Sequence, residues 1–149
     1  GVNKRHVVRA TWLRDEYEDV KLTARFFIGT MQIGEQSRND LVAENKTFKD
    51  LLFLPNVWDS YENLTAKVLH SLVKAYQDYE FDYVLKTDED SYVRVWKIAK
   101  SLRVLDCNQL LYWGQFTGRS LPMISGRWAE QEWNLCGRYI PYAFGGGYI

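Results

Sequence analysis

Three consecutive acidic residues, Asp88, Glu89 and Asp90, follow an apolar stretch at residues 81–86 that is typical of a strand. Adjacent carboxylates repel one another, so packing alone does not explain them. In an extended backbone, side chains at i and i+2 point the same way, which predicts that Asp88 and Asp90 converge while Glu89 faces elsewhere. Oxygen ligands of this kind suit Mn²⁺ or Mg²⁺, and such a cation can bind a diphosphate. The ordinary alternative for an Asp-x-Asp pattern is a solvated turn.

Alternating strands and helices are expected to position this acidic triplet. Apolar periodicity and turn residues predict helices over 4–14, 36–46, 60–77 and 93–105, and strands over 24–30, 50–54, 81–86 and 111–114. This order indicates an α/β fold with a largely parallel sheet. Ligands of open α/β sheets bind at the carboxyl ends of the strands, which is where the triplet falls.

Composition narrows the classes of partner. The chain has 149 residues, of which 46% are hydrophobic, as in a globular domain. Lys and Arg total 19, as do Asp and Glu, so no net field favours nucleic acid and an anionic ligand needs a local site. No apolar window is long enough for a membrane span. The apolar run at residues 144–149 predicts a fragment of a longer protein.

The last third of the chain is rich in aromatic residues, namely Trp113, Trp128, Trp133, Tyr139, Tyr142 and Tyr148. They form either a buried cluster or a platform on which sugar rings stack. Cys107 and Cys136 lack the spacing of a zinc site, and the sequence leaves their pairing open. Asn45 and Asn63 each begin an acceptor sequence for N-glycosylation.

Five blocks in order along the chain carry a more specific signal. They are Arg-x-x-x-Arg-x-Thr-Trp at 5–12, Phe-Phe-Ile-Gly at 26–29, residues 59–67, Lys-Thr-Asp-Glu-Asp-Ser-Tyr-Val at 86–93, and residues 141–148. Together they resemble the successive blocks of the β1,3-galactosyltransferase family over essentially the whole chain. Within that family, segments 61–69, 111–114 and 126–143 are most similar to the members that act on the glycosaminoglycan linkage region.

The resemblance implies a GT-A-type glycosyltransferase fold, in which a Rossmann-like, mostly parallel sheet is flanked by helices. This chain would be the N-terminal part of the catalytic domain, with a nucleotide-sugar-binding half at 1–105 and the start of an acceptor-binding region at 106–149. The implied reaction is inverting transfer from UDP-galactose, with Mn²⁺, to the 3-hydroxyl of galactose in a galactosyl-xylosyl-protein. The family also implies a type II Golgi membrane protein with a lumenal catalytic domain and an N-terminal anchor outside this chain.

The resemblance assigns residues to the nucleotide and the metal. Asp90 is expected to ligate the metal directly, and Asp88 to contact the ribose or to reach the metal through water. The family has Asp-Asp-Asp where this chain has Asp88-Glu89-Asp90. This chain therefore retains the two outer acids. Arg5, Arg9 and Lys67 are expected at the uridine or diphosphate, with a structural ion pair as an equal alternative for each.

Further residues are expected at the acceptor, and these are Trp128, Trp133 and Gly146. The three glycines 145–147 predict close approach of the backbone to a sugar or to a neighbouring strand. Asp59 is expected to cap the helix at 60–77. The general base of the family lies in a later block, beyond Ile149, so the catalytic residue is unknown and the fragment alone should not turn over.

Two other functions stay open from the sequence. One is another UDP-sugar β1,3-glycosyltransferase of the same family, transferring N-acetylglucosamine or galactose to a different acceptor. The other is a lectin-like module that binds sugar without depending on Mn²⁺ or UDP. A structural Ca²⁺ site is disfavoured because the triplet lacks the spaced ligands of a calcium loop.

Overall fold

The chain falls into two compact units. A computed structural model describes all residues except 16, 18–19, 106–108, 127–128, 131 and 135–136. The first unit comprises Gly1–Asp15 and Asp82–Ile149, and the second comprises Glu16–Phe81. The functional division at residue 105 remains a prediction, and each unit is described in its own right.

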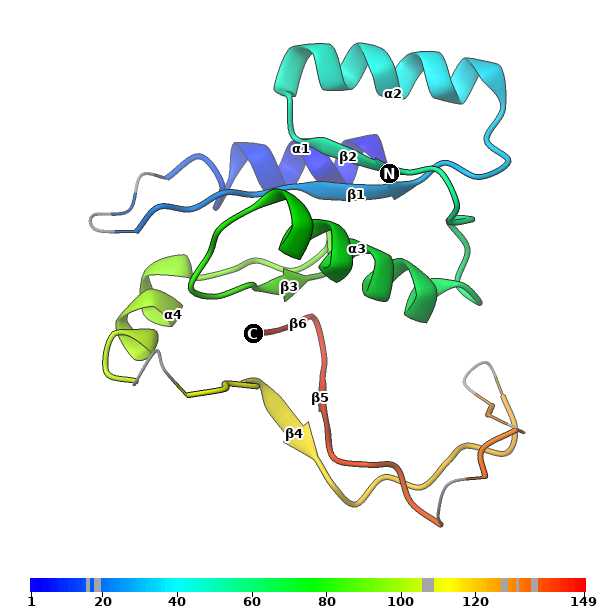
Figure 1. The fold of residues 1–149 in the computed structure, drawn as a ribbon, viewed down its shortest axis with the longest axis vertical. Coiled ribbons are helices and arrows are strands. Elements are labelled where there is room, and N and C mark those ends of the chain that lie inside the picture. Colours follow the sequence, from blue (N-terminus) through cyan, green and yellow to red (C-terminus); the bar gives the residue numbers. More distant parts are fainter. Residues whose placement is uncertain (16, 18–19, 106–108, 127–128, 131, 135–136) are drawn as a thin grey trace. The chain divides into compact units, whose positions relative to one another are not determined.

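The second unit is a strand–helix–strand–helix segment. Its elements are β1 (Phe26–Gly29), α2 (Glu35–Phe48), β2 (Leu51–Leu54) and α3 (Leu64–Asp78). Strands β1 and β2 run parallel in a register from Phe26 opposite Leu51 to Gly29 opposite Leu54, and Figure 1 shows them side by side. A parallel pair needs a crossover, which α2 supplies. The sequence predicted these four elements.

The two strands are short and apolar, and the interior of this unit lies against them. Leu51 and Leu54 of β2 are buried, together with Val57 and with Ala75 of α3. Gly29 closes β1 where the chain passes tightly: a Cβ there would lie 2.7 Å from the carbonyl oxygen of Val57. Only glycine therefore fits at this crossing without a backbone shift.

The connection from α2 to β2 involves Asn45, the first residue of one predicted N-glycosylation sequence. Lys49 ends the helix in the left-handed conformation, with φ 56°, which turns the chain toward β2. The Asn45 Oδ1 atom accepts a hydrogen bond from the backbone N–H of Leu51 at 3.0 Å. Asn45 thus has a structural contact, and its glycosylation stays a prediction.

Helix α3 begins later than predicted, at Leu64 rather than at residue 60. The prediction that Asp59 caps this helix is wrong, because Asn63 holds the N-cap position. The amide of Asn63 donates instead to Ser60 Oγ at 2.9 Å, within a turn that precedes the helix. The turn at residues 60–63 therefore takes the place of the first predicted helical turn. Glycosylation of Asn63 also remains a prediction.

The described residues of the first unit form two helices and four short strands. They are α1 (Val2–Ala10), β3 (Lys86–Thr87), α4 (Val95–Leu102), β4 (Gln115–Thr117), β5 (Tyr142–Phe144) and β6 (Gly147–Tyr148). Antiparallel pairs join β3 to β6 and β4 to β5. The buried apolar side chains of this unit are Val8, Trp12, Val93, Val95, Ala143 and Ile149.

Two strand predictions in this unit need correction. The strand expected at 81–86 consists only of Lys86–Thr87, and the one expected at 111–114 begins at Gln115. Trp113 nevertheless exchanges two backbone hydrogen bonds with Ile149, at 2.8 and 2.9 Å. These strands form by long-range pairing, whereas the sequence pattern reports only local preference.

The sheets are more mixed than the predicted largely parallel sheet. Of the three strand pairs among the described residues, β1–β2 is parallel and the other two are antiparallel. Gly145, with φ +92°, reverses the chain between β5 and β6 and so allows β6 to pair with β3. The combination of helices and small sheets is α/β in class, as predicted.

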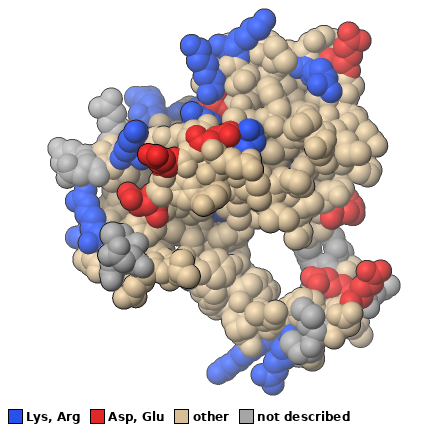
Figure 2. All heavy atoms as spheres, viewed as in Figure 1, with Lys and Arg blue, Asp and Glu red and all other residues tan. Residues whose placement is uncertain are grey.

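The surface carries both signs of charge, as the equal numbers of basic and acidic residues suggest. Figure 2 shows Lys and Arg side chains interspersed with Asp and Glu on the face that it draws. Among the residues that the structure describes, no helix has the length and apolar character that a membrane crossing requires.

Candidate functional site

The acidic triplet lies in a turn directly after β3. The backbone N–H of Ser91 donates to the carbonyl oxygen of Asp88 at 3.2 Å, which closes the turn. The prediction of an extended segment is therefore wrong, and so is the alternation of side chains drawn from it. Glu89 and Asp90 both reach the ammonium group of Lys4, whereas Asp88 contacts Lys86.

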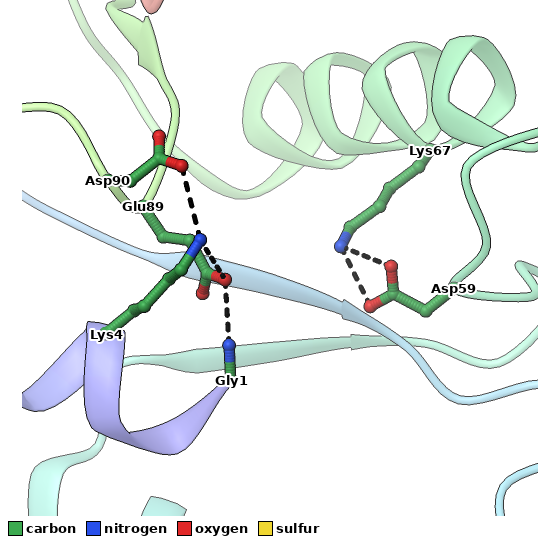
Figure 3. Close-up of polar contacts among 6 residues, drawn as sticks. All are labelled: Gly1, Lys4, Asp59, Lys67, Glu89 and Asp90. Atoms are coloured by element: carbon green, nitrogen blue, oxygen red, sulfur yellow. Dashed lines mark hydrogen bonds and ion pairs between the residues drawn. The ribbon is translucent and has the colours of Figure 1, made fainter. Parts of the chain in front are cut away.

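Lys4 projects from α1 onto this acidic turn (Figure 3). Its Nζ atom lies 3.2 Å from Asp90 Oδ2 and 3.8 Å from Glu89 Oε1. The sequence pattern predicts a helix over 4–14 but does not mark Lys4, because nothing local relates it to residues so far along the chain.

A buried tryptophan holds the N-terminal segment against the turn. Trp12 is 5% exposed, and its indole N–H donates to the carbonyl oxygen of Ser91 at 3.1 Å. Arg5 and Val8 are buried on α1, three residues apart and so on one face of the helix. These contacts fix the face of α1, and Lys4 is thereby held within reach of Asp90.

The pKa values of the pair follow from its contact. The hydrogen bond from Lys4, followed by its positive charge, lowers the pKa of Asp90 below the usual value. The same hydrogen bond and the charge of Asp90 raise the pKa of Lys4. Both groups are therefore charged at neutral pH. The side chains are 51% and 65% exposed, so water screens the pair and either partner can exchange it for another.

The glycine-rich segment lies against the acidic turn. The backbone N–H of Asp88 donates to the carbonyl oxygen of Gly146 at 2.7 Å. A Cβ at Gly146 would collide with the Ser91 hydroxyl, and one at Gly147 would lie 2.8 Å from the carbonyl oxygen of Lys86. Of the two predicted uses of these glycines, close approach to a neighbouring strand is the one seen. An acceptor role for Gly146 stays a prediction.

The carboxylates of this turn have the donor chemistry of a divalent metal site. Within the described ranges, no cluster of three or more His, Cys, Asp or Glu side chains is arranged to hold a metal ion. Hard cations at nucleotide sites use one or two carboxylates, and substrate phosphates and water complete their coordination. Asp88 and Asp90 are 48% and 65% exposed, so both can meet such a substrate. The residues fit a cation that arrives with a diphosphate.

The predicted nucleotide-binding cations differ in their surroundings. Arg5, which is 6% exposed, and Arg9, which is half-buried, lie on α1 in the first unit, and each makes at least one polar or ring contact. Lys67 belongs to the second unit, where its Nζ atom lies 2.7 and 2.8 Å from the two oxygens of Asp59 (Figure 3). For Lys67 the structure thus has the ion pair that the sequence left as an alternative.

Among the described residues of the first unit, aromatic side chains form two edge-to-face groups. Trp133 packs on Tyr139 with ring centroids 4.8 Å apart, and Tyr139 on Tyr142 at 5.7 Å. Tyr112 contacts both Phe116 and Tyr148. Trp133 is half-buried, so part of its ring is open to a ligand. Its acceptor role stays a prediction.

Some predicted residues cannot be placed. Trp128, Cys107 and Cys136 lie outside the described residues.

Comparisons with known proteins define the class. The pattern of the galactosyltransferase family matches residues 3–149, so the chain belongs to this family. It is 45% identical over its whole length to mouse beta-1,3-galactosyltransferase 6, of which it covers 47%. The predicted resemblance to the β1,3-galactosyltransferases is therefore confirmed.

More distant relatives extend the comparison. Hydroxyproline O-galactosyltransferase GALT2 of Arabidopsis thaliana is 30% identical over 99% of the chain, which spans 22% of that protein. UDP-GalNAc:beta-1,3-N-acetylgalactosaminyltransferase 2 of Xenopus laevis is 32% identical over 73% of the chain and 22% of its own length. The chain thus spans less than half the length of these relatives.

Proposed function

We propose that the full-length protein transfers galactose from UDP-galactose to the 3-hydroxyl of galactose in the galactosyl-xylosyl-protein linkage region of proteoglycans. The observation that carries this proposal is the 45% identity, without loss of coverage along the chain, to mouse beta-1,3-galactosyltransferase 6. The acidic turn, exposed and rich in hard oxygen donors, supports it.

The proposal includes a GT-A-type fold and a Mn²⁺ cofactor. Asp90 would hold the cation directly, and Asp88 would bind it through water or bind the ribose. The bound cation supplies charge neutralisation of the diphosphate as it leaves. Arg5 and Arg9 lie on the helix that also carries Lys4, and we assign them to positioning the nucleotide.

The other parts of the reaction require chain beyond residue 149. We place the general base there, in the block that the family resemblance implies. Trp128, Trp133 and Gly146 are our candidates for the acceptor side. A Golgi location with an N-terminal membrane anchor completes the proposal.

The test is a donor competition with the full-length protein. A galactosyl-xyloside acceptor is incubated with equal UDP-galactose, UDP-N-acetylglucosamine and UDP-N-acetylgalactosamine, with Mn²⁺ or with a chelator. We expect a β1,3-linked galactose product that is lost on chelation, and the linkage is read by nuclear magnetic resonance.

Two other outcomes would change the proposal. Preferred transfer of N-acetylgalactosamine would favour the activity named for the Xenopus laevis relative. Sugar binding that persists without Mn²⁺ or UDP, and without any transfer, would favour a lectin-like module. In either case the linkage-region activity is excluded.

A further inference from the structure

Lys4 is a cation that the proposed function does not yet use. This α1 side chain reaches the acidic turn, where it contacts both Glu89 and Asp90. Figure 3 shows its ammonium group between the two carboxylates. The helix itself is held by buried Arg5 and Val8, and nearby Trp12 bonds to Ser91. A long, half-exposed side chain on a fixed helix can therefore swing without moving the backbone.

A divalent cation and the Lys4 ammonium group compete for Asp90. Both are positive, so they cannot share one carboxylate oxygen at close range without strong repulsion. The Lys4–Asp90 pair is solvent-exposed and hence weak, which means that a divalent cation can displace it. The displaced ammonium group then lies near the place where a metal-bound diphosphate brings new negative charge.

We infer that Lys4 is an exchange residue of the nucleotide site. It pairs with Asp90 in the donor-free protein and turns to the diphosphate of the donor when the metal takes its place. This inference rests on the proposed function, and it adds a specific residue and a change of partner. Lysine suits the role because its ammonium group is a compact point charge on a flexible stem that can accept either partner.

The other lysines near acids have different settings. Lys86 contacts Asp88 from the adjacent strand β3 and also lies over the Tyr148 ring, 5.7 Å from its centroid. That second contact and its 24% exposure hold Lys86 in place. Among the residues that the structure describes, Lys4 makes no such contact with an aromatic ring, and it is 51% exposed.

The experiment measures binding rather than turnover. Full-length wild-type protein and the Lys4→Gln and Lys4→Arg variants are titrated by calorimetry, first with Mn²⁺ alone and then with UDP at saturating Mn²⁺. Lys4→Gln should bind Mn²⁺ about two- to fivefold more tightly, because a weak exposed competitor is gone. It should bind UDP about tenfold more weakly, because a charged hydrogen bond to the diphosphate is lost. Lys4→Arg should bind Mn²⁺ and UDP with affinities close to those of the wild type, since arginine retains the positive charge.

A matched control comes from α3. Lys74 forms a partly exposed pair with Asp78 at 2.8 Å, with side chains 35% and 37% exposed, so Lys74→Gln removes one lysine and one ion pair within the second unit. We expect it to bind Mn²⁺ and UDP as the wild type does. Thermal melts of all variants check that the fold is kept.

The opposite signs make the inference testable. If Lys4→Gln leaves both affinities unchanged, or weakens both, the exchange does not occur. Wild-type protein that binds neither Mn²⁺ nor UDP refutes the proposed function itself. Wild-type binding of both, with an unaffected Lys4→Gln variant, refutes only the role of Lys4.

Discussion

Replacing Gly147 by alanine should disturb the strand pair that supports the acidic turn. Gly147 lies opposite Thr87 in the β3–β6 pair. A Cβ at this position would be 2.8 Å from the carbonyl oxygen of Lys86 and 3.6 Å from the Cα of Thr87. Both obstacles are backbone atoms of the neighbouring strand, so no side-chain rotation relieves the contact and the strands must separate.

The size of the effect follows from this crowding. Forcing an extra methyl group into a close-packed place costs about 1–3 kcal/mol. For a domain of about 150–250 residues, each kcal/mol lowers Tm by about 2–4 °C, so Gly147→Ala should lower it by about 2–12 °C. The shift also moves Gly146, whose carbonyl oxygen accepts the Asp88 N–H at 2.7 Å. Mn²⁺-dependent UDP binding should therefore weaken together with stability.

The assay compares Gly147→Ala with Gly137→Ala in the full-length protein. Gly137 belongs to the same unit, and a Cβ there meets no atom of the described residues within 4 Å. Thermal melts and UDP titrations with Mn²⁺ are recorded for both. Gly137→Ala should match the wild type. If Gly147→Ala also melts and binds as the wild type does, the close approach of β6 to β3 is wrong.

Three further predictions concern the same unit. Asp90→Asn should reduce transfer by about 100-fold or more with little change in Tm, because an exposed carboxylate that holds the cation is lost. Trp12→Phe should lower Tm, since it removes both the hydrogen bond to Ser91, worth about 1 kcal/mol, and part of the buried indole ring. Burial raises the pKa of Tyr148, although Lys86 opposes this, so its phenolate should appear at higher pH than an exposed tyrosine in the near-ultraviolet difference between wild type and Tyr148→Phe. Because the folded pKa is the raised one, this contribution to stability is present below pH about 10 and is lost as the pH rises through the folded value.

Each of these has a result that contradicts it. Full transfer by Asp90→Asn would remove the proposed metal ligand. An unchanged Tm for Trp12→Phe would mean that Ser91 is not held by the indole. A Tyr148 phenolate that forms together with those of exposed tyrosines would mean that the ring is not desolvated.

Local signals predicted the second unit well. The β1–α2–β2 segment was expected from short apolar strands, a helical period and turn residues, all of which act over a few residues. Helix α3 was expected too, but its start was not, because a turn joining Asn63 to Ser60 replaced the first helical turn. The sequence also does not show that Asp59 pairs with Lys67, because the two residues lie eight positions apart and a turn separates Asp59 from the helix.

The candidate site was found only in part. The acidic residues and the glycines stood out by type and spacing, and the family resemblance gave them roles. Their arrangement did not follow from spacing, because Asp88 to Ser91 close a turn instead of extending a strand. Lys4 was missed altogether, since residues 86 apart in sequence carry no local mark of contact.

By itself the sequence determined the family, the α/β class and the elements of the second unit, because ordered motifs and periodicity are properties of neighbouring residues. Tertiary structure alone decided that β6 pairs with the two-residue strand β3 and that Lys4 meets Asp90. Such pairings join segments that are distant in sequence. Strands of two residues are too short for their β propensity to predict these pairings. The β3–β6 pair depends on the chain reversal at Gly145, and the Lys4–Asp90 contact depends on the hydrogen bond from Trp12 to Ser91. Only the folded chain brings these segments into contact.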